Sequence, residues 1–162
     1  MTSRTVQLPL ESVRLARHAP PFKRPERRLG AKGRGIRYEE KVQKYLLNDF
    51  APLYVPSPWL HFRERGSETF RWCQPDGLLI DLRRGVIVIV EIKYNHTADA
   101  WWQLNHLYRP VLSALFPPAL WRLEVCEIVK WYDPAVVFPE PCRLVNNPMK
   151  DVDSFRVHIF NS

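Results

Sequence analysis

The residues from 86 to 90 are Val-Ile-Val-Ile-Val, and this run constrains the fold more than any other part of the chain. Successive side chains of a strand point to opposite faces, so the run is apolar on both faces and needs cover on both. A central strand in a sheet packed between helices or loops has this environment. Glu91 and Lys93 follow on one shared face, where burying charge is costly unless each side chain has a partner. The sequence therefore predicts partners for both.

A second apolar stretch, residues 78–82, precedes the run and supplies a pairing strand. The Arg-Arg-Gly sequence at 83–85 separates the two, which predicts a hairpin whose glycine adopts a left-handed conformation. If the two arginines alone form the turn, Asp76 lies opposite Glu91 with Cβ atoms about 5 Å apart. A bulge at the glycine would move the pairing by one residue. We therefore predict that the two carboxylates are close, and leave the register open.

Two carboxylates this close destabilise each other unless a cation binds between them. Oxygen ligands of this kind favour Mg²⁺ or Mn²⁺. The histidines lack the spacing of a zinc site, and we expect His96 on a surface loop. The three cysteines are odd in number and widely spaced, which argues against a disulfide framework. The sequence thus predicts a magnesium or manganese site built from oxygen ligands.

Hydrophobic periodicity places the other elements around this hairpin. Apolar residues at helical spacing predict a first helix that begins near Gly35 and ends between Phe50 and Pro52. A second helix is expected from Thr97, kinked or ended at Pro110. Further strands are predicted at 59–64, 69–73, 120–132 and 155–160. The order of helix, three strands, helix, then one or two strands predicts an α/β fold with a mixed central β-sheet flanked by helices.

Positive charge is concentrated at the N-terminus. Residues 1–35 hold nine Lys and Arg against two Glu, so they account for the whole net charge of +7 and the remainder is neutral. This region also holds four prolines and no sustained periodicity, which is typical of an extended segment. We therefore expect a basic, proline-rich N-terminal arm at residues 1–34 and one domain at residues 35–162. Such an arm favours a polyanion partner, with a merely solvated tail as the alternative.

No stretch of the sequence reaches the roughly 20 apolar residues of a membrane span, and no apolar core follows the N-terminus as in a secretory signal. We expect a soluble protein of the cytoplasm that associates with DNA and not with membranes. An Arg-rich organelle-targeting peptide in residues 1–18 is an alternative that Pro9 and Glu11 weaken.

Four short motifs match a known family in type and order. They are Gly-x-x-x-Glu at 35–39, Pro-Asp-Gly at 75–77, Glu-Ile-Lys at 91–93 and Gln-Leu at 103–104. In these features, over about residues 35–131, the chain resembles the PD-(D/E)XK nuclease superfamily. The acidic-x-Lys triplet alone is weakly specific, so the resemblance depends on its context at the end of a buried hairpin strand. It implies a restriction-endonuclease-like αβββαβ core.

The resemblance implies roles for the residues of the hairpin. Asp76 and Glu91 would ligate one divalent metal, Mg²⁺ or Mn²⁺, together with the backbone carbonyl of Ile92. Lys93 would orient the attacking water or offset the charge that develops on the phosphate. Metal and ammonium together suit an in-line displacement at phosphorus.

The two flanking helices would each add one residue. Glu39 is the expected carboxylate of the first helix, because its apolar neighbours place this stretch against the core, and Glu40 is the near competitor. Gln103 matches the glutamine that contacts phosphate or the active-site water in the family. Either glutamate could also be an ordinary surface residue, and Gln103 a plain polar helix residue.

The predicted function is a divalent-metal-dependent DNA endonuclease, a hydrolase of phosphodiester bonds. By resemblance to small relatives, the substrate would be structured or branched DNA, such as a Holliday junction in recombination or repair. Contacts to the backbone position a duplex without reading bases, so little sequence specificity is expected. The residues expected to grip phosphates are Arg24, Arg27, Arg28, Lys32 and Arg34.

Three alternatives stay open at this point. The same fold also carries exonucleases and sequence-specific restriction-like enzymes, and the fold does not decide among them. A catalytically inactive DNA-binding or assembly module is the non-enzymatic alternative. Cutting both strands of a duplex or junction commonly needs two active sites, which suggests a homodimer.

Overall fold

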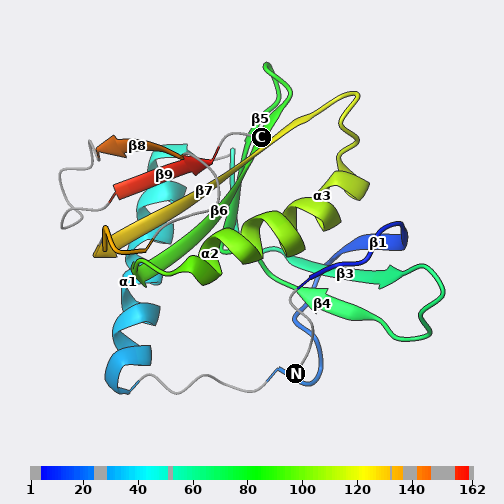
Figure 1. Cartoon of the computed structure of the whole chain (residues 1–162), viewed down its shortest axis with the longest axis horizontal. Coiled ribbons are helices and arrows are strands. Elements are labelled where there is room, and N and C mark those ends of the chain that lie inside the picture. The colour runs from blue at the N-terminus through cyan, green and yellow to red at the C-terminus, as the bar shows by residue number, and fades with distance from the viewer. Residues whose placement is uncertain are drawn as a thin grey trace.

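The computed structural model describes residues 5–23, 29–50, 53–131, 133–136, 142–146 and 156–160. Its largest element is a six-stranded sheet of order β2-β5-β6-β7-β9-β8 (Figure 1). The strands are β2 (Tyr54–Pro56), β5 (Gly77–Asp81), β6 (Val86–Asn95), β7 (Arg122–Trp131), β8 (Cys142–Asn146) and β9 (Arg156–Phe160). Strands β6 and β7 run parallel, and the other neighbouring pairs run antiparallel. The sheet is therefore mixed, as predicted.

Helices cover both faces of this sheet, which explains the apolar character of β6 on both faces. Helix α1 (Gly30–Phe50) packs on one face, with Val42 and Leu46 against Val90 and Ile92. On the other face, Ile87 and Ile89 pack against the helical segment that follows β6. Two separate apolar cores result, one on each side of the sheet. Figure 1 shows α1 behind the central strands and the second helical segment in front.

The second helical segment continues through the proline that was predicted to kink or end it. It consists of α2 (Ala98–Gln103), a π-helical turn η1 (Leu104–Tyr108) and α3 (Arg109–Leu115). Pro110 has no N–H to donate to the carbonyl of His106, and the π turn absorbs the resulting break in the hydrogen-bond ladder. That carbonyl instead accepts a hydrogen bond from the N–H of Val6, at 3.0 Å. The N-terminal segment thus docks at the His106 carbonyl, which Pro110 leaves without its helical hydrogen bond.

The hairpin of β5 and β6 has the register in which Asp76 opposes Glu91. Leu78 pairs with Ile89, and Gly77 pairs with Val90. Gly85 has a φ of 62°, the left-handed conformation predicted for it. No bulge shifts the hairpin, so the side chains at its open end meet in the predicted way.

A second sheet of three strands, order β1-β3-β4, lies beside α3 at the right of Figure 1. It consists of β1 (Leu10–Ala16), β3 (Trp59–Glu64) and β4 (Arg71–Cys73). The strands predicted at 59–64 and 69–73 exist, but they pair with each other and, through β3, with the N-terminal strand β1, and not with the central sheet. The place beside β5 in the central sheet belongs to β2, which the sequence analysis missed.

The predicted division into an arm at 1–34 and a domain from 35 is wrong in this structure. Val6 is buried in the core, β1 is an integral strand, and α1 begins at Gly30. The helix was expected to begin near Gly35 because the apolar residues at helical spacing start at Ile36, whereas glycines, which lower helix propensity, precede them. Tertiary packing overrides propensity here, since Gly33 is buried within the first turns. The boundary at 34/35 therefore falls inside a helix.

These elements define an α/β protein with two sheets and helices on both faces of the larger one. Among the described residues, no helix is long and apolar enough to cross a membrane.

Candidate active site

The three residues predicted from the hairpin meet at its open end. Glu91 and Lys93 lie on β6, and Asp76 immediately precedes β5. The Oδ2 atom of Asp76 accepts a hydrogen bond of 2.6 Å from the N–H of Ile92. A residue's N–H and C=O point to the same edge of a strand, so the carbonyl of Ile92 is directed to the Asp76 side as well. One end of the sheet thus gathers two carboxylates and a main-chain oxygen.

Glu91 is the most deeply buried of the predicted site residues. It is 3% exposed, and its Oε1 atom lies 2.5 Å from the Nζ atom of Lys93. Its Oε2 atom has no hydrogen-bond partner among the described residues. A buried carboxylate oxygen without a partner is costly, and a ligand to such an atom would remove that cost.

Lys93 connects the carboxylates to the helix that follows. Its Nζ atom donates a 3.3 Å hydrogen bond to the Oε1 atom of Gln103, the last residue of α2. The structure thus places Gln103 beside Lys93. Because Lys93 bonds to both Glu91 and Gln103, its ammonium is held at the edge of the carboxylate pair.

The pKa values of these groups move in the directions expected of crowded, buried charge. Burial, reinforced by Glu91, raises the pKa of Asp76 to about 8. Burial also raises the pKa of Glu91, and nearby Glu39 adds to the effect. Burial opposes the charge on Lys93, but the ion pair with Glu91 outweighs it and raises the pKa of Lys93. If both were ionised, the two carboxylates would carry more negative charge than the single lysine offsets, and their raised pKa values reflect this cost.

The structure separates the two helix glutamates that the sequence left as competitors. Glu39 is partly buried, and its Oε1 atom accepts a hydrogen bond of 3.2 Å from the Nε2 atom of Gln43. The same Nε2 atom lies 3.1 Å from the carbonyl oxygen of Asp76. Glu40, by contrast, is exposed. Glu39 is therefore the glutamate of α1 that lies next to the site.

A group of polar side chains around the main chain of Asp76 was missed. Its carbonyl oxygen accepts hydrogen bonds from the Tyr54 hydroxyl, at 3.1 Å, and from the N–H of Ser57, at 2.9 Å, besides Gln43. At Gly77 a Cβ atom would collide with the ring of Tyr54. The Gly after Asp76 was the one available signal of this close approach. These contacts fix the backbone that presents the Asp76 carboxylate.

A second buried acid beside the site was also missed. Glu127 on β7 is opposite Glu91 in the parallel register, so both side chains leave the same face of the sheet. Its Oε2 atom lies 2.6 Å from Nδ1 of His96, which is buried and not on the surface loop that was predicted. Burial raises the pKa of Glu127 to about 8 and lowers the pKa of His96. The pair extends the polar network from β6 to β7.

The basic residues predicted to grip phosphates are placed only in part. Lys32 and Arg34 are exposed on the first turns of α1. The other three, Arg24, Arg27 and Arg28, lie outside the described residues. The structure thus offers two of these five cations to solvent near the start of a helix.

Among the described residues, no three His, Cys, Asp or Glu side chains are placed to hold a metal ion together. The candidate metal site predicted from the sequence has only two such side chains, Asp76 and Glu91, and its third oxygen would come from the main chain of Ile92. What distinguishes the candidate site is therefore the burial of its charged side chains.

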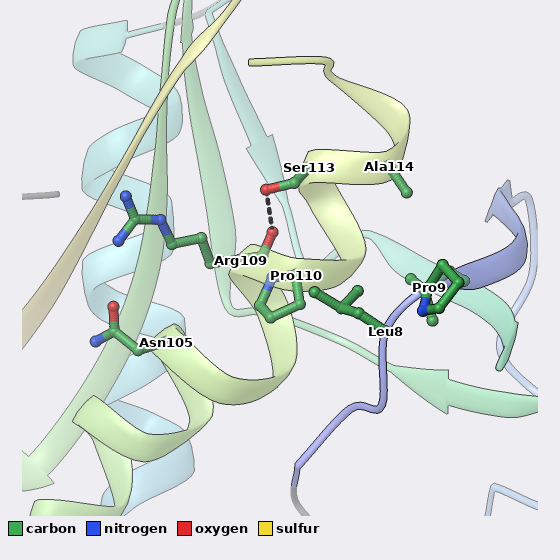
Figure 2. Close-up of a pocket in the computed structure, with 8 residues that line it drawn as sticks. Leu8, Pro9, Asn105, Arg109, Pro110, Ser113 and Ala114 are labelled. Atoms are coloured by element: carbon green, nitrogen blue, oxygen red, sulfur yellow. Dashed lines mark hydrogen bonds between the residues drawn. The ribbon is translucent and has the colours of Figure 1, made fainter. Parts of the chain in front are cut away.

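A pocket of about 470 Å³ lies between residues 8–10 and the helix segment that carries Asn105 and Arg109. Figure 2 shows Leu8 next to Pro110 there, with Pro9 beyond Leu8, and Ser113 donating a hydrogen bond to the main chain of Arg109 one turn earlier. Its lining residues include no carboxylate, so this groove lacks the chemistry found at the end of β6.

Comparisons with protein-family models, with curated proteins and with solved structures found no match to this chain. The resemblance to the PD-(D/E)XK superfamily thus stays a prediction from the sequence.

Proposed function

We propose that this protein is a divalent-metal-dependent nuclease that hydrolyses phosphodiester bonds in DNA. The observation that carries the proposal is the meeting of Asp76, Glu91 and Lys93 at one end of a buried hairpin. Such a concentration of perturbed, buried charge is typical of functional sites, because structure alone gives little reason to maintain it. The order of α1, β2, β5, β6, α2 and β7 also fits a restriction-endonuclease-like αβββαβ core, with β3 and β4 inserted.

The donor set fits a hard divalent cation such as Mg²⁺ or Mn²⁺. Asp76, Glu91 and the carbonyl of Ile92 would hold it, and all three supply oxygen, the ligand atom that these ions prefer. The unpartnered Oε2 atom of Glu91 is the specific observation in favour of a ligand there. A cation would also stabilise the ionised form of both carboxyl groups, whose pKa values are raised first by burial and further by neighbouring carboxylates. When bound, a divalent metal supplies Lewis acidity and lowers the pKa of water.

The residues around this position supply the rest of the chemistry. Lys93 keeps its proton, because Glu91 raises its pKa, and it therefore presents a positive charge to a phosphate or to the attacking water. Gln103 holds that ammonium in place and has an amide N–H₂ group left to donate to a phosphate oxygen. Glu39 adds a carboxylate from α1 that can orient water.

The proposed substrate is structured or branched DNA, cut with little sequence specificity. The support is electrostatic: the net charge of +7 lies in the N-terminal 35 residues, and the body is neutral. Phosphate contacts of this kind position a nucleic acid without reading its bases. A homodimer would place two active sites on one substrate, as paired cuts require.

Cleavage of plasmid and four-way junction DNA with Mg²⁺ or Mn²⁺ tests this proposal. We expect the wild type to cut and Asp76→Asn to be inactive. Asp81→Asn is the matched control, because Asp81 lies at the other end of β5 and bonds only within its turn in the described contacts. Metal binding has a separate readout: Mn²⁺ should raise the Tm of the wild type and not that of Asp76→Asn. A wild type that never cuts with either metal would exclude catalysis.

A non-catalytic DNA-binding module is the second candidate. The observation in its favour is the concentration of the net charge of +7 in the N-terminal 35 residues, which would hold DNA whether or not the protein cuts it. Binding of junction DNA without cleavage, together with no shift of Tm by Mn²⁺, would establish this alternative. An exonuclease would instead degrade linear DNA and leave circular DNA intact.

A further inference from the structure

The outer face of the three-stranded sheet carries aromatic rings in a continuous series. Trp59 and His61 of β3 lie beside Trp72 of β4, with ring centroids 6.4 Å and 4.4 Å from that of Trp72. Phe70 stacks on His61 at 4.2 Å and 22°. Phe22 meets Trp72 edge-on at 6.5 Å. These five rings form one surface, which we call the aromatic face.

The aromatic face is not the side of the sheet that fills the core. The alternate residues Leu60, Phe62 and Cys73 point inward and are 0%, 0% and 5% exposed. A sheet with one buried face ordinarily turns polar side chains outward. Here Phe70 and Phe22 are 47% and 69% exposed. Trp59, His61 and Trp72 are partly exposed on the same outer side. None of the five rings is fully buried in the core, and their presence on this side needs another reason.

Cations border the aromatic face. The Nζ atom of Lys23 lies 4.7 Å from the centroid of Trp59, and the guanidinium of Arg63 lies 5.1 Å from that of Phe70. Arg14, exposed on β1, pairs with His61 across the sheet and therefore leaves the same side. One carboxylate, Glu11, bonds to Arg63 at 2.7 Å. The face thus combines flat apolar rings with an excess of positive charge.

We propose that the aromatic face binds unpaired bases of single-stranded nucleic acid. Aromatic rings stack on any base, and neighbouring cations follow the phosphates, which together give affinity without sequence specificity. An apolar protein partner would not require the cations at the rim. The proposal rests on the proposed function only for the nature of the substrate: the face would hold the unpaired strand of the branched DNA that the site cuts.

The aromatic face and the candidate active site are close to each other along the chain. Trp72 precedes Asp76 by four residues, so the two Cα atoms lie within about 14 Å of each other. Stacked nucleotides rise by about 3.4 Å, and the separation thus corresponds to roughly four nucleotides at most. Lys23, at the rim, contacts Gln74 between the two at 3.5 Å. One short strand could therefore occupy both places.

The test is the affinity of the full chain for fluorescent oligo-dT and for a duplex of equal length, measured by anisotropy in EDTA to prevent cleavage. We expect Phe70→Ala to weaken oligo-dT binding by about 10-fold and duplex binding much less, because only unpaired bases can stack. Phe50→Ala is the matched control, since Phe50 is 41% exposed at the end of α1. It should leave both affinities unchanged.

The salt dependence of the affinity distinguishes the contribution of the rings from that of the charges at the rim. The loss caused by Phe70→Ala should persist at higher salt, whereas Arg14→Ala should reduce the slope of log affinity against log salt by about one. Equal losses for oligo-dT and duplex, or no loss with Phe70→Ala, would overturn the proposal. Self-association that Phe70→Ala abolishes, without oligo-dT binding, would overturn it in favour of a contact between copies. If the wild type binds oligo-dT but cuts no DNA, the proposed nuclease activity would be refuted and the proposed role of the aromatic face would stand.

Discussion

At the end of β6, charged side chains lie where burial favours apolar ones, whereas on the outer face of β3 and β4 aromatic rings lie where solvent favours polar ones. The first arrangement destabilises the folded protein, because Glu91 is 3% exposed and its Oε2 atom has no hydrogen-bond partner in the part of the chain that the structure describes. The second costs little stability, because an exposed ring is merely not buried. The buried charges and the exposed rings thus differ in their cost to stability. Mutations at the two regions should therefore have different effects, which can be measured separately.

The largest expected effect is on catalysis at the end of β6. Lys93→Met should lower the rate of DNA cleavage by about 10²- to 10³-fold, because the ammonium that faces the phosphate is lost. Binding of oligo-dT in EDTA should stay within about twofold, since the aromatic face is untouched. Cleavage rates and anisotropy on the same preparation, with folding checked by circular dichroism, measure both. Loss of both properties in a folded variant would mean that the two regions act as one.

The next effect contrasts the two faces of the three-stranded sheet. Phe62→Ala should reduce the free energy of unfolding by about 3–5 kcal/mol, because Phe62 is fully buried and its removal leaves a cavity. Phe70→Ala should reduce it by less than about 1 kcal/mol, because Phe70 is about half exposed. Urea unfolding measures both values. Similar losses in the two variants would show that the outer rings belong to the core after all.

A smaller effect is expected from the helix carboxylate. Glu39→Gln should lower cleavage by about 10-fold, because Glu39 lies beside Asp76 and Glu91 and supports their environment. Glu40→Gln, the same change on the neighbouring exposed residue, should leave the rate unchanged. Cleavage assays under single-turnover conditions give the comparison. A larger loss for Glu40→Gln would remove Glu39 from the site.

The smallest effect is on stability without metal. Burial raises the pKa of Asp76 from its ordinary value near 4 to about 8, so the folded state binds more protons than the unfolded state between these limits. The metal-free protein should therefore lose stability as pH rises through this window. Asp76→Asn removes this contribution, so at pH 8 its Tm should exceed that of the wild type by a few degrees. A wild type that becomes more stable over the same pH range would contradict the raised pKa.

The central hairpin was predictable because its determinants are local. A period of two fixes the shared face of Glu91 and Lys93, and a short turn with Gly85 fixes the register. Apolar character on both faces of β6 similarly indicated cover on both. These features need no knowledge of distant residues, which is why the sequence brought Asp76 and Glu91 together.

The remaining parts depend on contacts that the sequence does not display. Nothing local shows that β1 pairs with β3, which places the hairpin of β3 and β4 in a sheet of its own. The carbonyl of Asp76 is held by Gln43, from a segment 33 residues earlier. Likewise, Glu127 comes beside Glu91 only through the parallel pairing of β6 with β7. Local sequence patterns do not predict long-range pairing of this kind.

The hydrogen bond between Val6 and His106 has a consequence for how the chain folds. It joins residues 100 positions apart, so forming it closes a long loop whose entropic cost is met only after the intervening elements are in place. The N-terminal segment should therefore dock late in folding, onto a helix that already contains its π turn. Truncation at residue 8 would leave the His106 carbonyl without this donor and expose part of the core that Val6 covers. The first residues of the described chain thus dock last and cover the core beside the π turn.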